Sequence, residues 1–178
     1  MKQKQIKDCK RIDQFESHFA CIGNKLEEMF EFIKRTPDTV FAKNFYDITD
    51  FLQYCFCQAL CQLSHIEKPS KYSEYKNSVD ESNVDESGDD YIEDSNDENN
   101  TFDQVKKYHT YMRDIDTEIE HLHMIASDIS DKTIAREYIK IVNYLIEVYV
   151  HALNILRSIS FEPMRLNQPF GGCSSKLN

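Results

Sequence analysis

The sequence predicts an all-α protein in which four long heptad-patterned helices form two antiparallel hairpins that pack as a four-helix bundle. The 178 residues contain four Gly, four Pro and no Trp, which leaves little turn chemistry for a sandwich or barrel of many short strands. Apolar residues recur at alternating steps of three and four in four segments, a spacing typical of packed helices. Short breaks or one acidic stretch separate these segments.

The first hairpin is expected over residues 8–67. The seam of its first helix consists of Ile12, Phe15, Phe19, Ile22, Leu26, Met29 and Ile33. Thr36-Pro37-Asp38 interrupts the pattern, because proline disfavours helix in the residue before it and tolerates a new helix just after it. The seam of the second helix consists of Phe41, Phe45, Ile48, Leu52, Cys55 and Ala59. Pro69 closes this hairpin.

The second hairpin is expected over residues 101–160. Its first seam runs without interruption and consists of Val105, Tyr108, Met112, Ile115, Ile119, Leu122, Ala126 and Ile129. Ser130-Asp131-Lys132 supplies a short break with residues that cap helices. The last seam consists of Tyr138, Ile141, Leu145, Val148, Ala152, Ile155 and Ile159. We expect this helix to stop before Pro163.

The domain organisation follows from these elements. Residues 8–160 are expected to form one bundle domain, preceded by a basic lead (1–7) and followed by a non-helical tail (161–178). Residues 68–100 are predicted to be a disordered acidic linker, since they carry too little apolar surface to offset the entropy lost on ordering. A second arrangement stays open, in which the hairpins pair with other chains instead of with each other.

The formal net charge of −10 comes from one segment. Residues 77–100 hold ten carboxylates and no Lys or Arg, so the other 154 residues hold 21 acidic and 21 basic side chains. A folded part without basic excess disfavours direct nucleic-acid binding. The polar start of the chain and the lack of roughly 18 to 20 uninterrupted apolar residues predict no membrane association and a cytoplasmic or nuclear location.

The linker carries a pattern of modification sites. In its acidic part, residues 77–100, an acidic residue follows three positions after each of the four serines, Ser78, Ser82, Ser87 and Ser95. This spacing resembles the preference of acidophilic kinases of the casein kinase 2 type, so we predict phosphorylation there. Two interpretations of the linker stay open. One is an adjustable arm for a basic partner such as a histone, and the other is a solvating spacer.

Two segments are more apolar than a bundle seam requires. The sixteen residues between Asp50 and Glu67 include no Asp, Glu, Lys or Arg, and Glu147 is the only such residue from Ile141 to Leu156. The candidate partner interface on these faces consists of Phe51, Phe56, Leu60, Leu63, Val142, Tyr149, Leu153 and Leu156. Either loops and the tail cover these faces, or they bind another subunit.

Candidate metal ligands are sparse. Cys57, Cys61 and His65 are four residues apart and share one helix face, where they could bind zinc or copper(I). A fourth ligand and a C-x-x-C pair are missing, so we predict no cofactor. Glu118 and His121 have the Glu-x-x-His spacing of di-iron bundles, but such sites need two of these motifs and two further glutamates. Because Ile115, Ile119 and Leu122 define the core face of this helix, we expect His121 on a solvated face.

The sequence predicts only the general class of function. No nucleotide-binding, hydrolase or zinc-protease motif occurs, so we expect a non-enzyme. The first hypothesis is an adaptor or scaffold subunit of an intracellular complex that binds other helical subunits through the charge-poor faces. The second is an acidic chaperone-like protein that holds a basic client through residues 77–100. The third is a thiol and histidine metal-binding bundle.

Overall fold

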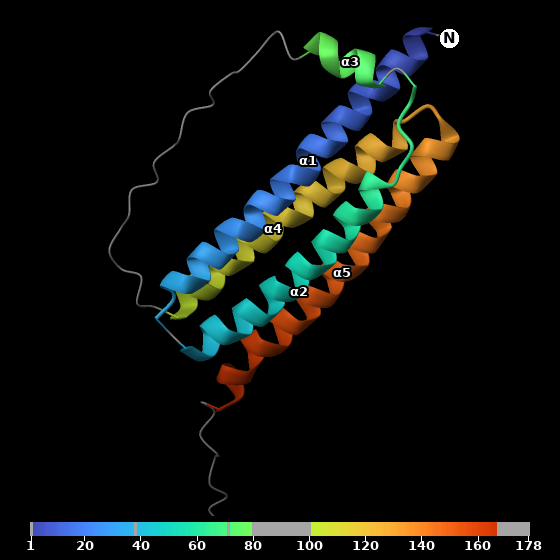
Figure 1. The fold of residues 1–178 in the computed structure, drawn as a ribbon. Coiled ribbons are helices and arrows are strands. Elements are labelled where there is room, and N and C mark those ends of the chain that lie inside the picture. The colour runs from blue at the N-terminus through green and yellow to red at the C-terminus, as the bar shows by residue number, and fades with distance from the viewer. Residues whose placement is uncertain (1, 38, 71, 80–100, 167–178) are drawn as a thin grey trace, which may run out of the picture.

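The structure is a computed structural model that describes residues 2–37, 39–70, 72–79 and 101–166. Within these residues the chain forms helices and no strands. The helices are α1 (Lys2–Arg35), α2 (Thr39–Ser64), α3 (Tyr72–Val79), α4 (Thr101–Ser127) and α5 (Lys132–Leu166). The four long helices α1, α2, α4 and α5 lie side by side as one bundle (Figure 1). The predicted all-α class and four-helix bundle are confirmed.

Every long helix runs antiparallel to both of its neighbours (Figure 1). α1 packs against α2 and α4, and α5 packs against the same two, so α1 lies diagonally from α5 and α2 diagonally from α4. The two hairpins therefore pack on each other within one chain, and this decides between the two arrangements that the seams left open.

This order explains the length of the connection between the hairpins. α2 ends beside the start of α1, whereas α4 begins at the opposite end of the bundle (Figure 1). The chain between Val79 and Thr101 must therefore join opposite ends. α4 has 27 residues and is about 40 Å long at about 1.5 Å per residue. The 21 residues numbered 80–100 reach at most about 70 Å, so they are long enough for this crossing.

The predicted seams line the core. Every seam residue of α1 is at most 6% exposed, and those of α4 from Tyr108 onwards are at most 4% exposed. Two aromatic contacts cross the diagonals. Phe15 of α1 meets Tyr138 of α5 edge-on with ring centroids 4.7 Å apart, and Phe45 of α2 stacks on Tyr108 of α4 at 4.2 Å. Such pairs contribute about 0.5–1.5 kcal/mol beyond area burial, so they help to hold the hairpins together.

Polar groups fix the end of the bundle where α4 turns into α5. The buried carboxylate of Asp8 in α1 accepts hydrogen bonds from the backbone N–H of Ser130 at 2.8 Å and of Asp131 at 3.2 Å. Oδ1 of Asp131 in turn accepts from the N–H of Thr133 at 2.9 Å and of Ile134 at 3.2 Å, which makes it the N-cap of α5. The turn is thus attached to α1.

Two helix ends differ from the prediction. α1 begins at Lys2, so the basic lead is helical from its second residue, because Lys, Gln and Ile there are compatible with a helix. α5 runs to Leu166, so residues 161–166 of the predicted non-helical tail are helical. Pro163 lies in the last turn, so only three residues of the helix follow the position at which proline cannot donate a backbone hydrogen bond. The rest of the tail lies outside the described residues.

Helix α3 corrects the prediction that residues 68–100 are disordered throughout. Tyr72 is buried against the core and its hydroxyl donates a hydrogen bond to Glu16 of α1 at 2.6 Å. Lys68 also pairs with Glu16, and Lys76 pairs with Asp13 at 2.5 Å. These contacts supply the burial and charge compensation that the acidic part of the segment lacks. Residues 80–100 lie outside the described residues.

One described helix segment, Lys132–Ile159 of α5, is long and apolar enough by length and composition to cross a membrane. This is weak evidence for a span, because a core helix of a bundle has the same composition. In this fold the apolar seam of that segment faces the other three long helices.

Replacing Asp8 should destabilise the bundle. Asp8→Ala leaves two backbone N–H groups without their acceptor at a part-buried site, and we expect the free energy of unfolding to fall by about 1–3 kcal/mol in chemical denaturation. Asp8→Asn keeps one carbonyl acceptor and should lose less. Asp47→Ala, at an exposed position of α2, is the control and should change stability by less than about 0.5 kcal/mol. Equal losses at Asp8 and Asp47 would contradict the proposed role of Asp8.

Stability should also fall at high pH. Burial raises the pKa of Tyr108 and Tyr138, and it raises the pKa of Tyr149 to about 12. Because these phenols ionise near pH 10 in an unfolded chain, above about pH 10 the unfolded state releases protons that the folded state keeps. The free energy of unfolding therefore decreases from about pH 10 upwards. In denaturation at a series of pH values, Tyr149→Phe should reduce the loss between about pH 10 and 12 by roughly 2 kcal/mol. If Tyr149→Phe loses as much free energy of unfolding over this pH range as the parent protein does, the role of Tyr149 is contradicted.

Candidate functional site

The eight residues of the predicted partner interface differ in how far they are exposed in the structure. Phe51 and Leu153 are half-buried against the core, and Leu60 is 49% exposed. The other five are buried in the core, namely Phe56, Leu63, Val142, Tyr149 and Leu156. The prediction that these faces are open to a partner is therefore wrong for the five buried residues.

The physical reason is that each long helix has two neighbours, so its buried stripe is wider than a single seam. Phe56 illustrates this, because its ring stacks on Phe19 of α1 with centroids 4.6 Å apart. A Cβ atom added to Gly23 would lie 3.3 Å from the Phe56 ring. The absence of a side chain at Gly23 gives Phe56 room between α1 and α2.

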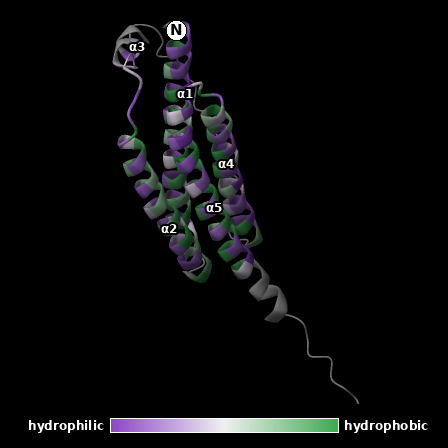
Figure 2. Ribbon diagram, turned by 90° about the vertical axis from the view of Figure 1, so that its right-hand side faces the viewer, coloured by the Kyte–Doolittle hydropathy of each residue, from purple (hydrophilic) through white to green (hydrophobic). Residues whose placement is uncertain are grey.

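The outward side of α2 keeps exposed, uncharged side chains. Tyr54 is 64% exposed, Leu60 is 49% exposed, and the thiols of Cys57 and Cys61 are also exposed. Cys57 lies three residues after Tyr54, and Leu60 and Cys61 lie three and four residues after Cys57, so the four share one side of the helix, and we call them the α2 strip. α2 lies along the outside of the bundle (Figure 2). The strip lies inside the sixteen-residue stretch that has no Asp, Glu, Lys or Arg.

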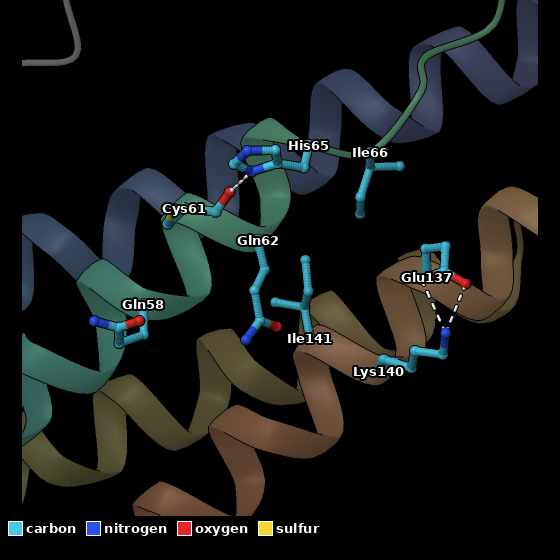
Figure 3. Close-up of a pocket in the computed structure, with 8 residues that line it drawn as sticks. All are labelled: Gln58, Cys61, Gln62, His65, Ile66, Glu137, Lys140 and Ile141. Atoms are coloured by element: carbon cyan, nitrogen blue, oxygen red, sulfur yellow. Dashed lines mark hydrogen bonds and ion pairs between the residues drawn. The ribbon is translucent and has the colours of Figure 1, made fainter.

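A shallow hollow of about 300 Å³ lies next to the α2 strip, between α2 and α5 (Figure 3). Gln58 and Gln62 line it from α2, and Ile141 lines it from α5. At its rim, Lys140 donates to both carboxylate oxygens of Glu137 at 2.8 and 3.0 Å. The hollow thus offers amide groups and an apolar side chain, with its charges paired to each other.

The predicted ligands Cys57, Cys61 and His65 are not brought together as a metal site. Nδ1 of His65 lies 2.6 Å from the backbone carbonyl oxygen of Cys61, so the ring contacts the main chain (Figure 3). Sγ of Cys57 accepts a hydrogen bond from the amide of Gln53 at 3.7 Å. Among the described residues, these three side chains do not form a cluster of ligand atoms.

A different cluster joins α1 to α4. Nδ1 of His18 lies 2.7 Å from Oε2 of Glu118, and Nδ1 of His121 lies 3.9 Å from the same oxygen. The two imidazole rings are 4.9 Å apart between centroids. One potential ligand atom from each residue lies within 4.8 Å of the other two, and no other such group of three occurs in the part of the chain that the structure describes. This cluster could hold a metal ion.

The cluster borders a hollow of about 650 Å³ on the side of the bundle formed by α1 and α4. Arg11 and Asp128 close one end of this hollow through an ion pair of 2.7 Å. Arg11 also donates to Gln14 at 3.0 Å, so its charge is directed to partners other than the cluster. The three cluster side chains are therefore reachable from solvent and free of a neighbouring lysine or arginine contact among the described residues.

Sequence reasoning missed this cluster. The Glu-x-x-His spacing of Glu118 and His121 was visible, but His121 was expected on a solvated face. The sequence does not indicate that His18 belongs to the same cluster. His18 is 100 residues from Glu118 and reaches it only because α1 and α4 are antiparallel neighbours. The order of helices around a bundle cannot be read from four similar seams.

The predicted sites of the linker are mostly outside the described residues. Ser78 lies in α3, while Ser82, Ser87 and Ser95 lie in residues 80–100. The proposed binding of a basic protein through the acidic residues 77–100 stays a prediction. Comparison with protein-family models, with curated proteins and with solved structures finds no match to this chain.

The corrected assignment of Phe56 and Leu60 can be tested by stability. Phe56→Ala removes a buried ring and should lower the free energy of unfolding by about 3–5 kcal/mol. Leu60→Ala, one turn further along the same helix, should change it by less than about 0.5 kcal/mol, because Leu60 is half exposed. Chemical denaturation of both variants gives the comparison, and a similar loss in both would show that the distinction is wrong.

Proposed function

We propose that this protein is a non-enzymatic helical adaptor that binds a protein partner through the α2 strip. The observation that carries the proposal is the combination of exposure and missing charge on the outward side of the second half of α2, residues 51–64. Tyr54 and Leu60 are exposed there, in a stretch of sixteen residues without a charged side chain. A solvated helix face is normally rich in charged residues, so this face has the composition of a contact surface.

The outward side of α1 gives the contrast within the same bundle. It carries ion pairs one turn apart, Lys25 with Glu28 at 2.9 Å and Lys34 with Glu31 at 2.5 Å. Pairs of this kind are what an exposed helix face usually presents to water. The second half of α2 differs in charge from this face of α1 although both belong to long helices of the same bundle, which supports a special role for α2.

The expected partner is an amphipathic helix with an uncharged apolar face. The helical part of the charge-free stretch, residues 51–64, covers about 21 Å at about 1.5 Å per residue, a length over which two helices can pack. The hollow between α2 and α5 beside the strip provides a groove for its side chains, in the manner of helix-in-groove recognition. The side-chain amides of Gln58 and Gln62 in this hollow can donate hydrogen bonds to polar groups at the edge of the partner helix, or accept hydrogen bonds from them.

We also propose that the protein is located in the cytosol or nucleus. All five described cysteines are free thiols, and Cys57 and Cys61 are exposed one turn apart on the same helix side. Exposed thiols in this arrangement are typical of a reducing compartment, because oxidising compartments favour disulfides.

Site-specific crosslinking tests the adaptor proposal. A photo-reactive phenylalanine analogue at position 54 should give a crosslink to one defined protein in native cells. The same analogue at Arg113, an exposed position of the diagonally opposite α4, should not. The double variant Tyr54→Glu and Leu60→Glu should then weaken binding of the purified partner by more than about tenfold, since it places charges in an apolar contact.

Circular dichroism and thermal unfolding show whether the double variant keeps the fold. We expect both to be unchanged, because the two positions are exposed. Equal crosslinking from positions 54 and 113, or full affinity of the folded double variant, would contradict the proposal.

A further inference from the structure

We propose that His18, Glu118 and His121 bind one divalent transition-metal ion of the zinc class between α1 and α4. This site is independent of the α2 strip and goes beyond the adaptor function. The three side chains come from helices that are distant in sequence, and they are 36%, 22% and 40% exposed. They are therefore sheltered by the bundle and still open to an ion from solvent.

The spacing of the ligand atoms fits a metal ion. In a tetrahedral site with metal–ligand distances of about 2.0–2.1 Å, two ligand atoms lie about 3.4 Å apart. The distances to Oε2 of Glu118, 2.7 Å from His18 and 3.9 Å from His121, fall on either side of this value. Side-chain movements of less than about 1 Å would bring these ligands to the required spacing.

The donor set selects the class of ion. Imidazole nitrogens suit zinc, copper, iron and nickel, whereas magnesium and calcium prefer oxygen ligands. Two histidines and one glutamate are also the protein ligands of zinc sites that keep a fourth position open for water. Here the fourth position would face the hollow of about 650 Å³ and take a water molecule.

The environment of His121 gives a second, independent indication. Its Nδ1 atom is shielded from solvent and makes no hydrogen bond with any residue that the structure describes. A polar atom that is shielded from water and lacks a hydrogen-bond partner destabilises the folded state. Coordination of a metal ion would use this nitrogen and remove this destabilisation.

The flanking core holds the two helices in place at the site. Phe19 and Ile22 next to His18, and Ile119 and Leu122 next to Glu118 and His121, are all at most 4% exposed. Because buried neighbours fix the backbone on both helices, the ligand positions exist before an ion binds. Such preorganisation is a requirement for a defined metal site.

The test uses the full chain carrying Cys57→Ser and Cys61→Ser, so that these exposed thiols do not compete for the ion. Calorimetric titration with Zn²⁺ should show one ion per chain, and Mg²⁺ should not bind. Co²⁺ should give the visible absorption of a bound ion without the near-ultraviolet band of thiolate coordination. His18→Gln and His121→Gln should each weaken Zn²⁺ binding at least about tenfold, since even the loss of an outer-shell partner costs about 10–100-fold.

The matched control is His109→Gln, an exposed histidine about three turns away on α4, which should bind Zn²⁺ as tightly as the parent. Circular dichroism should show the same helicity in all variants, and Zn²⁺ should raise the Tm of the parent and of His109→Gln alone. The proposal is overturned if the parent does not bind Zn²⁺. It is equally overturned if the folded variants His18→Gln and His121→Gln bind Zn²⁺ as tightly as the parent. Thiolate coordination of Co²⁺ that persists in these two variants would overturn it as well.

Discussion

The packing of α1 against α4 is the contact on which the rest of the structure depends. Within each hairpin the chain turn already brings the helices together, whereas this contact and that of α2 with α5 are the main helix–helix contacts that join the hairpins. It brings the carboxylate of Asp8 to the turn at Ser130, and it brings His18 to Glu118. It also places the start of α4 opposite the end of α2, so a long crossing connection is a geometric necessity.

Closure of the bundle also decides which apolar residues stay available. A helix with two neighbours buries a wide stripe, so Phe56 and Tyr149 are core residues although they lie off the seam. Burial in the core does not account for all uncharged residues of α2, because Tyr54 and Leu60 are exposed and lie in a stretch with no Asp, Glu, Lys or Arg. On α2, what burial does not explain therefore lies on one side of the second half of the helix, and the charge-poor part of α5 also keeps Ile146 and Val150 exposed.

The two proposed sites use different parts of the bundle. The α2 strip belongs to the helix diagonally opposite α4, whereas the histidine cluster lies between α1 and α4. Changes at Tyr54 do not touch the cluster, and changes at His18 do not touch the strip. Either proposal can therefore fail without affecting the other. A metal ion at His18 would add a link across the contact that closes the bundle, which connects the ion to stability.

The sequence by itself determined the all-α class, the seams and the breaks at Pro37 and Ser130, because helical periodicity and helix-breaking residues are local properties. It could not identify α3, whose order depends on contacts with Glu16 and Asp13 of α1. Only the tertiary structure decided which helices are neighbours, which off-seam residues are buried, and that His18 meets Glu118 and His121. The physical reason is that four similar apolar stripes can pack in more than one order, and each order brings different polar residues together at the helix interfaces.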